Sequence, residues 1–435
     1  MRVLIVGPYY PDIGGVTSYV HNLALELIIH GHSVAIFQTR PGKDYLWAKL
    51  KVYRLPYTLQ RRIRAFAKGL LVLVRFSISD LRGFIKVSKS LLLKPREVLR
   101  FLIIMGRVYE IINDFSPHII HSNHLSTRSL ACGVVSRILG IPMVITAHGY
   151  DTSPPSSLGE YLLRNIVLNY TDRAIVLTKT KRRILELLYV FYSSKVIVIP
   201  NCIPCKNTLV IRTVRNNEEL LVLKKETKMR LGIDPRNIVI AFLGRINRRK
   251  GVFDILECAK NICQSKKELC SKMKILIVGS GKDKELVEKS IEELKVPNVM
   301  FIGSVDKVTK NIILRATDLL LLPTYHDEAF PTVILEAYAE GTPVIAYPFL
   351  GANEIIEKGV TGFVLHGRNV RLLCEMLYDI CNKMSMLNKM GFNALVHIKK
   401  KYCCEHLVHK RIVPMYRDLL AQRCKAVSEW KHNDD

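Results

Sequence analysis

The sequence of 435 residues lacks any apolar run near the roughly 18 to 20 residues that a helix needs to cross a bilayer, so it predicts no membrane-spanning helix. Acidic residues are also scarce, because 38 Asp and Glu stand against 65 Lys and Arg, and the formal charge is +27. Such an excess indicates an anionic partner, namely nucleic acid, an anionic membrane surface or a phosphorylated substrate. The hydrophobic content of 49 % excludes a disordered chain, and the length allows two domains of ordinary size.

The eleven cysteines show no spacing typical of a stapled secreted domain. Cys202 and Cys205 form a C-x-x-C pair, but no second pair follows at zinc spacing, so a redox or metal role is disfavoured there. His118, His121 and His124 fall at the end of an expected strand, where the alternation of side chains would direct them to different faces. Substrate contact or packing is therefore favoured over a metal site at these histidines.

Strand and helix patterns alternate twice along the chain, which is typical of two doubly wound α/β domains. Residues 2–6 predict the first core strand rather than a signal sequence, because the apolar stretch is short and a Gly-rich turn follows. Further strands are expected at 118–121, 143–147, 174–178 and 196–199, and then at 238–242, 274–278, 299–302, 318–322, 342–346 and 362–365. Residues 206–230 are polar and predict an extended linker or a surface insertion.

The most informative stretch, LLPTYHDEAFPTVILEAYAEGTPVIA, runs from Leu321 to Ala346. It combines the end of a buried parallel strand, a loop, a helix whose first turn suits Pro331, and the next strand. Glu328 lies in the loop at the carboxyl end of the strand, and Glu336 lies inside the helix. The loop amides and the helix dipole favour an anionic or hydroxyl-rich ligand, and a sugar nucleotide fits both descriptions.

The two acids are separated by seven residues, and this spacing resembles the E-x7-E signature of retaining GT-B glycosyltransferases of the family 4 type. Other segments follow in the order of that family: Gly14-Gly15 after the first strand, AHGYD at 147–151, IPN at 199–201 and GRINRRKG at 244–251. Each motif is weak alone, but their joint order extends the resemblance over nearly the whole chain, apart from about residues 40–110 and 206–230.

The resemblance implies the GT-B fold, in which two doubly wound, Rossmann-like α/β domains face a cleft. It implies an acceptor-binding domain over residues 1–204, a nucleotide-sugar-binding domain over residues 205–402, and a C-terminal helix over residues 403–435 that returns to the first domain. It also implies transfer with retention of the anomeric configuration, which the residues themselves do not show.

Sugar transfer from a nucleotide requires stabilisation of a diphosphate leaving group and of an oxocarbenium-like centre. Arg245 and Lys250 follow the expected strand at 238–242, where a doubly wound sheet binds its ligands, and the resemblance implies that they neutralise the diphosphate. The alternative is an ordinary basic loop. By the same resemblance, Glu336 accepts hydrogen bonds from the ribose, and Glu328 lies beside the donor sugar.

His148 resembles the active-site histidine of the family, and with Glu328 it completes the expected catalytic pair. Gly14 and Asp151 are expected to contact the acceptor, because Gly14 permits close backbone approach at a helix start and Asp151 follows the histidine. The remaining donor contacts are assigned by the resemblance to Gly15, Phe330, Pro331, Thr332 and Val333.

The chain departs from the family at one loop, since many relatives have Gly-Phe-Gly where this chain has Ala329-Phe330-Pro331. Proline carries no N–H, so the loop offers one donor fewer, which bears on donor specificity rather than on the reaction. No Asp-x-Asp motif lies in a suitable loop, so we expect a metal-independent donor site and no cofactor besides the nucleoside diphosphate sugar.

Residues 49–110 have a different character, with fifteen Lys or Arg against three acids. A basic residue recurs at every seventh position, which on a helix drifts by only about 20° per step and forms a single stripe. The expected membrane-surface residues are Arg61, Arg64, Lys68, Arg75, Arg82, Lys86 and Lys89. Roughly the opposite face carries Ile63, Phe66, Leu70, Val74, Leu81 and Phe84. The pattern predicts a basic amphipathic insertion whose apolar face packs on the first domain.

Three uses of this insertion stay open. The basic stripe is merely solvated, or it contacts anionic headgroups, where each basic residue contributes about 1 kcal/mol. Nucleic acid is disfavoured, because no aromatic platform accompanies the charge.

The sequence therefore predicts a retaining glycosyltransferase that moves a sugar from a nucleoside diphosphate donor to a lipid-linked or membrane-associated glycan acceptor. We expect a cytoplasmic protein, peripheral on the inner face of the membrane. The alternatives are an enzyme of the same fold with a soluble acceptor, such as a sugar phosphate, and a non-catalytic protein that binds nucleotide sugars or polyanions.

Overall fold

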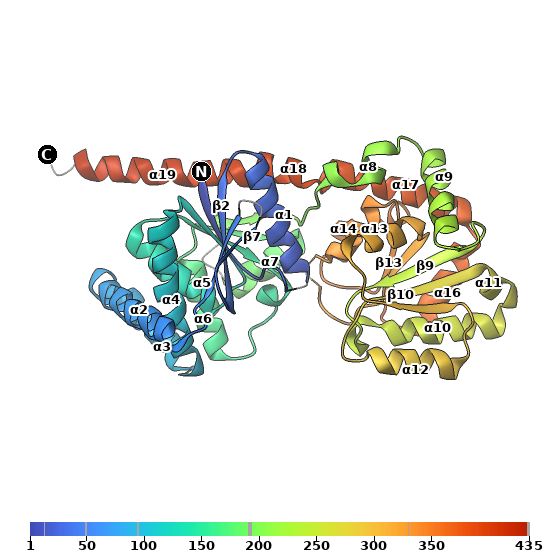
Figure 1. The fold of residues 1–435 in the computed structure, drawn as a ribbon, viewed down its shortest axis with the longest axis horizontal. Coiled ribbons are helices and arrows are strands. Elements are labelled where there is room, and N and C mark those ends of the chain that lie inside the picture. The colour runs from blue at the N-terminus through green and yellow to red at the C-terminus, as the bar shows by residue number, and fades with distance from the viewer. Residues whose placement is uncertain (13, 48–49, 94, 190–193, 329, 433–435) are drawn as a thin grey trace. The chain divides into compact units, whose positions relative to one another are not determined.

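The computed structural model describes residues 1–12, 14–47, 50–93, 95–189, 194–328 and 330–432, and the chain forms two compact units. The first unit comprises Met1–Asn201 and Cys404–Asp435, and the second comprises Cys202–Cys403. Each unit contains a largely parallel sheet covered by helices (Figure 1). The predicted pair of doubly wound α/β domains is therefore confirmed.

The first unit is built on an eight-stranded sheet in the order β3-β4-β2-β1-β5-β6-β7-β8, in which only β3 is antiparallel to its neighbour. Its strands are β1 (Arg2–Val6), β2 (Ser33–Pro41), β3 (Tyr45–Trp47), β4 (Leu50–Leu55), β5 (Ile119–Asn123), β6 (Met143–Ala147), β7 (Arg173–Val176) and β8 (Val196–Val198). The central strands are apolar and buried on both faces, as parallel strands between two helical layers must be. The strand order reverses between β1 and β5, so the loops at that point are the place where such a sheet binds ligands.

Helices cover both faces of this sheet: α1 (Gly15–Ile29), α2 (Leu59–Ser79), α3 (Leu81–Leu92), α4 (Pro95–Phe115), α5 (Thr127–Leu139), η1 (Gly149–Thr152), α6 (Leu158–Asn169), α7 (Lys179–Leu188), α18 (Cys404–Leu407), η5 (Val408–Ile412) and α19 (Val413–His432). The last three elements follow the whole second unit in the sequence. Val408, Ile412 and Tyr416 are nevertheless buried in the same core as β1 and β2. The C-terminal segment is thus part of the first unit.

The basic insertion differs from the prediction in two ways. Residues 50–55 form β4 inside the sheet, so the insertion begins only at α2. The expected single stripe is also wrong, because the backbone leaves the helix at Asp80 (φ −147°, ψ 76°) and separates α2 from α3. The Asp80 carboxylate accepts a hydrogen bond from the Gly83 amide at 2.8 Å, and it caps α3.

The face of the insertion that packs on the unit is not the predicted one. Of the six apolar residues expected to pack there, Phe66 and Phe84 lie against the core, while Ile63, Leu70, Val74 and Leu81 are exposed. The closest contact is made by glycines, since a Cβ on Gly69 of α2 would lie 2.0 Å from the Leu102 carbonyl oxygen of α4. Glycine therefore allows α2 and α4 to pack closely, while four of the six predicted apolar residues lie on the exposed side.

The second unit has a six-stranded parallel sheet in the order β11-β10-β9-β12-β13-β14. Its strands are β9 (Ile238–Leu243), β10 (Met273–Val278), β11 (Val299–Gly303), β12 (Leu319–Leu322), β13 (Val344–Ala346) and β14 (Gly362–Val364). Its helices are η3 (Cys205–Asn207), α8 (Leu209–Thr213), α9 (Asn217–Arg230), η4 (Arg248–Lys250), α10 (Val252–Ser265), α11 (Lys267–Lys272), α12 (Lys284–Leu294), α13 (Lys307–Ala316), α14 (Thr332–Ala339), α15 (Ala352–Ile355), α16 (Val370–Cys381) and α17 (Met384–Lys401). Here the strand order reverses between β9 and β12.

The prediction of a linker or surface insertion over residues 206–230 is wrong, because α8 and α9 occupy this segment and α9 packs on the second unit. Two of the lysines that make the segment polar are buried. The Lys228 ammonium forms an ion pair with Asp318 at 2.6 Å, and the Lys224 ammonium donates to the Thr317 carbonyl. From the sequence alone, a buried lysine cannot be told from an exposed one, because its partner lies about 90 residues away.

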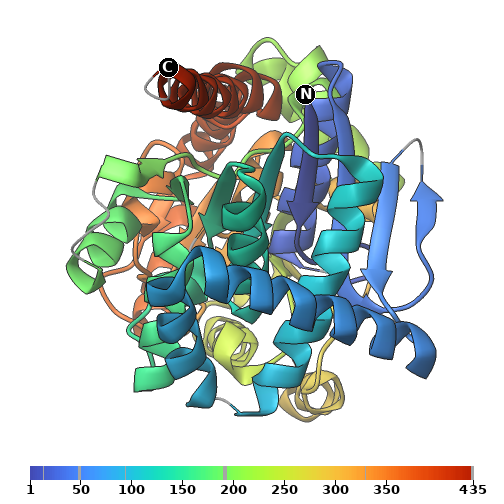
Figure 2. The same ribbon diagram turned by 90° about the vertical axis from the view of Figure 1, so that its left-hand side faces the viewer.

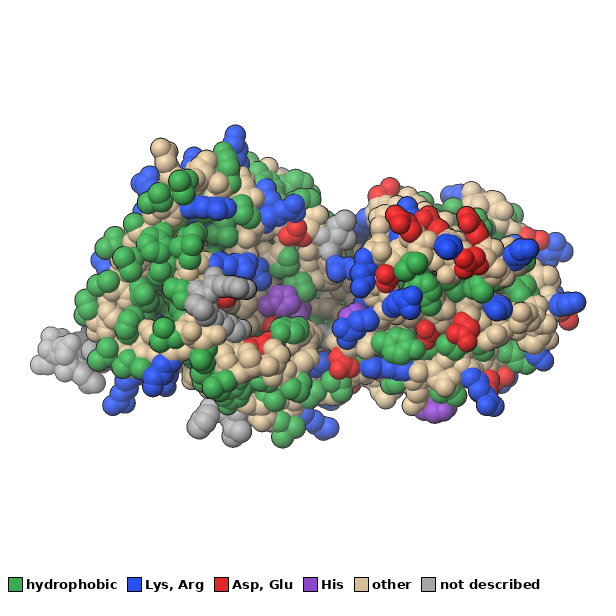
Figure 3. All heavy atoms as spheres, turned by 90° about the horizontal axis from the view of Figure 1, so that it is seen from below, with side chains coloured by type: hydrophobic (Ala, Val, Ile, Leu, Met, Phe, Trp, Pro, Cys, Tyr) green, Lys and Arg blue, Asp and Glu red, His purple; other side chains and the backbone are tan. Residues whose placement is uncertain are grey.

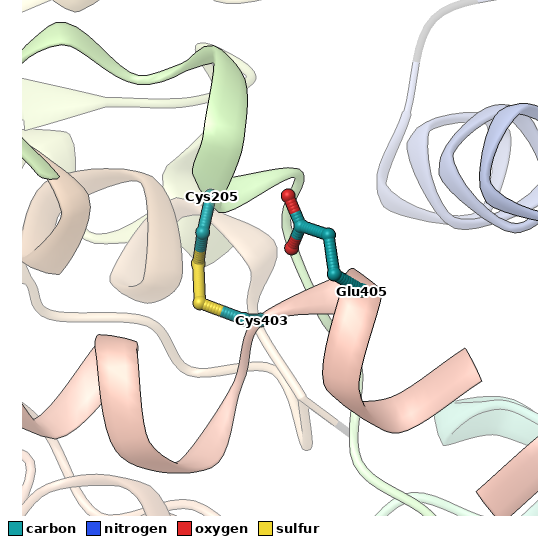
Figure 4. A group of neighbouring side chains, drawn as sticks. All are labelled: Cys205, Cys403 and Glu405. Atoms are coloured by element: carbon teal, nitrogen blue, oxygen red, sulfur yellow. A yellow bond between two sulfur atoms is a disulfide. The ribbon is translucent and has the colours of Figure 1, made fainter. Parts of the chain in front are cut away.

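Disulfide bonds were not expected from the spacing of the cysteines, but six of the eleven cysteines are disulfide-bonded, Cys202 and Cys404 among them. Cys205 is joined to Cys403 across 198 residues, and Cys263 is joined to Cys270. Figure 4 shows the first bond, with Glu405 drawn in the same view. Because the Cys205 sulfur is already bonded, the C-x-x-C pair offers no pair of free thiols for a metal.

Candidate active site

In the second unit, the loops that follow β9, β10 and β12 meet at the reversal of strand order. The Ile246 amide donates to the Ser280 carbonyl at 2.9 Å, and the Tyr325 amide donates to the Arg249 carbonyl at 2.8 Å. Gly251 has φ 73°, and a Cβ there would lie 1.9 Å from the Pro323 carbonyl oxygen. Glycine is therefore required for the loop after β9 to approach the loop after β12.

An ion pair between Lys250 and Glu328 crosses this reversal point. The Lys250 ammonium donates to Oε1 of Glu328, and the Thr324 hydroxyl donates to the same oxygen at 3.4 Å. Both charged side chains stay partly exposed, at 24 % and 20 %. The structure thus brings together a cation and an acid that are 78 residues apart in the sequence. Arg245, on the same loop as Lys250, is exposed.

Glu336 lies on α14 and has a partner that sequence reasoning missed. Its Oε1 accepts a hydrogen bond from the Lys310 ammonium of α13 at 2.7 Å, and both side chains are about one fifth exposed. This pair is separate from the one between Lys250 and Glu328. The sequence gives no signal for Lys310, because a lysine on an amphipathic helix resembles any other surface lysine.

The loop between the two acids offers backbone rather than side-chain groups. Phe330 is buried, with its ring 5.6 Å from that of Tyr402. Pro331 precedes the helix as its N-cap, so α14 begins at Thr332, one residue later than expected. The amides of Thr332 and Val333 belong to the first turn, where a helix supplies no acceptor of its own. These two amides therefore have no acceptor within the helix.

In the first unit, α1 begins at Gly15 just after β1, with Gly14 as its N-cap. Both glycines are exposed, and a Cβ on Gly14 would meet no atom within 4 Å. The packing of the protein therefore does not demand glycine at position 14. Open space before the helix start is the geometry that lets a ligand approach the backbone.

His148 follows β6 and is held from the end of β5. Its Nε2 lies 3.0 Å from Oδ1 of Asn123, and the Asn123 amide nitrogen donates to the Val6 carbonyl at 3.1 Å. Because the second bond fixes the orientation of the amide, Oδ1 faces the imidazole and the proton must be on Nε2. Burial, with the neighbouring charge of His124, lowers the pKa of His148 to about 3, so this imidazole is neutral.

Asp151 is buried, and both of its oxygens have protein donors. Oδ2 accepts from the His148 amide at 2.7 Å and contacts Nδ1 of His124 at 2.9 Å, while Oδ1 accepts from the Leu125 amide at 2.9 Å. Burial alone would raise the pKa of Asp151, but the hydrogen bond and charge of His124 lower it overall. The carboxylate ties the loop after β5 to the loop after β6, and this geometry indicates positioning rather than direct contact with an acceptor.

The three histidines near β5 lie in separate surroundings. His118 accepts from the Arg2 amide at 2.9 Å near the amino end of the strand, and His124 pairs with Asp151 at the other end. His121 is buried between the hydroxyls of Thr146 and Tyr416. Burial lowers the pKa of His121 to about 3. Sequence reasoning missed Asn123, Thr146 and Tyr416, which have no motif of their own.

Two family models match the chain. "Glycosyltransferase Family 4" matches residues 13–207, and "Glycosyl transferases group 1" matches residues 224–396. An uncharacterized glycosyltransferase of Methanocaldococcus jannaschii is 23 % identical over 405 residues, which cover 92 % of this chain and 94 % of that protein.

Solved structures share the architecture. Sucrose-phosphate synthase from Thermosynechococcus elongatus superposes with a TM-score of 0.72 at 17 % identity, covering 97 % of this chain and 99 % of that one. Anabaena HepE in complex with UDP-glucose superposes with a TM-score of 0.66 at 14 % identity, covering 99 % and 100 %. At these identities the likeness shows the fold alone.

Proposed function

The chain belongs to the GT-B glycosyltransferases, and we propose that it is a retaining, metal-independent enzyme that transfers a sugar from a nucleoside diphosphate sugar to a lipid-linked or membrane-associated glycan acceptor. The observation that carries the proposal is the ion pair of Lys250 and Glu328 at the strand reversal of the second unit, with Arg245 exposed on the same loop. Such a reversal is where doubly wound sheets bind nucleotides.

The second unit binds the donor in this proposal. Departure of a nucleoside diphosphate leaves negative charge on its phosphate oxygens, and Arg245 and Lys250 neutralise that charge in place of a metal ion. Glu328, held by Lys250, lies beside the donor sugar, and Glu336, held by Lys310, accepts from the ribose hydroxyls. The amides of Thr332 and Val333 at the start of α14 donate to sugar or phosphate oxygens.

The first unit binds the acceptor in this proposal. His148 acts as a neutral hydrogen-bonding group and not as a general acid, because its pKa is held near 3. Asn123 orients this imidazole, and Asp151 holds the backbone amide of His148. The exposed backbone at Gly14 and Gly15 lets a phosphate or a hydroxyl approach α1.

A membrane-associated acceptor suits the charge and surface of the first unit. Within the described ranges, no helix combines the length and the hydropathy that crossing a bilayer requires. In this proposal the protein is peripheral, on the inner face of the membrane.

A soluble acceptor is the second candidate. The fold is shared with sucrose-phosphate synthase, whose name describes a soluble sugar phosphate as product. A non-catalytic binding protein is disfavoured, because the chain retains both acids and both cations of the expected donor site.

Turnover tests the proposal. The protein is incubated with UDP-, GDP- and ADP-sugars, an acceptor lipid extract and EDTA, nucleotide release is followed, and the anomeric configuration of the product is read by NMR. We expect release from one donor class with retention, and at least a hundredfold lower kcat/KM for Lys250→Ala, since the charge at the leaving group is lost.

Lys284→Ala is the matched control, because Lys284 is an exposed lysine on α12 of the same unit. It should turn over like the wild type. Inversion of configuration, or equal turnover by Lys250→Ala and the wild type, would refute the proposed mechanism.

A further inference from the structure

The first unit exposes many large apolar side chains on α2 and α3. On α2 they are Leu59, Ile63, Leu70, Leu71, Val74 and Ile78, and on α3 they are Leu81, Ile85 and Leu92. The exposed fraction reaches 81 % at Ile78 and 75 % at Leu92. Scattered apolar residues are normal on a protein surface, but a continuous apolar surface along two consecutive helices marks an interaction site.

These side chains form the outward face of both helices. The buried residues of α2 are Ala65, Gly69, Val72 and Phe76, and those of α3 are Gly83, Val87, Ser90 and Leu91. At about 100° per residue, the exposed apolar residues of each helix lie on the side opposite to its buried residues. The outward apolar face is therefore distinct from the core, and burying it would remove nine leucine, isoleucine and valine side chains from water.

A row of basic residues runs beside the apolar face. Arg61, Arg64 and Arg75 are exposed on α2, and Arg82, Lys86 and Lys89 are exposed on α3. On both helices this row lies about a quarter turn from the apolar residues in the same rotational sense. Lys68, expected in the same stripe, instead forms an ion pair with Glu110 of α4 at 2.8 Å. Lys68 therefore links α2 to α4 and does not belong to the exposed basic row.

The figures show the position of this surface. In Figure 2, α2 is the blue helix that runs across the front of the first unit, outside α4. Figure 3 shows apolar side chains over much of the first unit, with basic side chains among them and at their edge. We call the nine apolar residues of α2 and α3, together with the six basic residues of the row beside them, the α2–α3 surface.

We propose that the α2–α3 surface docks in the plane of an anionic bilayer, with its apolar side chains inserted at the boundary of the acyl chains and its arginines and lysines on lipid phosphates. This deepens the proposed function, because it names the partner and the mode of docking. It replaces the expectation of purely electrostatic attachment, since the apolar face points away from the protein. Insertion in the plane is how amphipathic helices hold peripheral proteins.

Charge favours a bilayer over a second copy of the chain. Two copies that met through this surface would bring two rows of six basic residues together without acids to pair them, whereas anionic headgroups neutralise every row. The 21 residues of α2 make a rod of about 30 Å, which suits a flat surface.

Vesicle flotation with the full chain tests the proposal without use of catalysis. The wild type should float with vesicles of phosphatidylglycerol and phosphatidylcholine, and binding should weaken but persist at high salt. Leu71→Ser with Val74→Ser and Ile78→Ser should lower the partition coefficient more than tenfold at every salt concentration. Arg82→Gln with Lys86→Gln and Lys89→Gln should lower it mainly at low salt, by about fivefold per charge.

The matched control combines Val222→Ser, Leu286→Ser and Val308→Ser, which are exposed aliphatic positions on helices of the second unit. It should bind like the wild type. The proposal is overturned if the wild type does not float, if the apolar variant binds like the control, or if sedimentation velocity shows a dimer that only the apolar variant breaks. Turnover of a soluble acceptor analogue should be the same in all variants, so loss of docking and failure of the transferase assignment remain distinguishable.

Discussion

Single residues of the first unit show how burial fixes chemistry around His148. The Asn123 amide is oriented by the Val6 carbonyl, and it leaves the imidazole with a proton on Nε2. Nearby, the Tyr19 hydroxyl lies 3.0 Å from the Thr146 hydroxyl, which in turn lies 2.7 Å from Nε2 of His121. Burial removes both imidazoles from water, and this loss of hydration outweighs the nearby Asp151 carboxylate at His148, so both buried histidines are neutral.

The neutrality of these histidines predicts a dependence of stability on pH. The pKa values of His121 and His148 are lowered from 6.5 to about 3, so below pH 6.5 the unfolded chain binds protons that the folded chain does not. The stability that the two neutral histidines contribute is therefore fully present above pH 6.5, and the free energy of unfolding falls as the pH drops toward 3. Each histidine should lower the free energy of unfolding by about 2 kcal/mol between pH 7 and pH 5.

Hydrogen exchange of the β5 and β6 amides at the two pH values measures this loss. His121→Gln should remove about half of the difference, while a Gln in place of the exposed His366 should leave it unchanged. A difference that is the same in all three proteins would show that the buried histidines are not its source.

At the scale of elements, the sequence predicts best where its signal is local. The central strands are continuous apolar runs, and their positions agree with the structure within a few residues. The break between α2 and α3 was missed because it depends on one capping carboxylate, Asp80. The helix α9 was missed because Lys224 and Lys228 find partners about 90 residues away.

Because α2 and α4 lie so close at Gly69, we expect even one added methyl group at this residue to destabilise the protein. In Gly69→Ala the new methyl would lie 2.0 Å from the backbone oxygen of Leu102, so the helices must separate, and we expect a loss of about 1 to 3 kcal/mol in the free energy of unfolding. Thermal melting measures the effect. Gly14→Ala, whose methyl meets nothing within 4 Å, should melt like the wild type. Equal melting of both variants would mean that α2 is not held at Gly69.

At the scale of the whole molecule, the order of motifs and strands was enough to predict the fold. It was not enough to predict which side chains pair with the site residues. Glu328 and Lys250 were both expected from the sequence, but their ion pair follows from the adjacency of β9 and β12. Lys310 beside Glu336 and Asn123 beside His148 carry no motif. The outward apolar face of α2 was also hidden, because the sequence of an amphipathic helix does not say which side is covered.

The central claim is that Lys250 and Glu336 bind a nucleoside diphosphate in the second unit without a metal. Calorimetric titration of UDP, GDP and ADP in EDTA into the wild type, Lys250→Ala, Glu336→Ala and the control Lys284→Ala tests it most directly. The account predicts that one diphosphate binds the wild type and the control equally, and that Kd rises at least tenfold in the other two variants. Absence of binding by all three nucleotides, or equal Kd values in all four proteins, would contradict it.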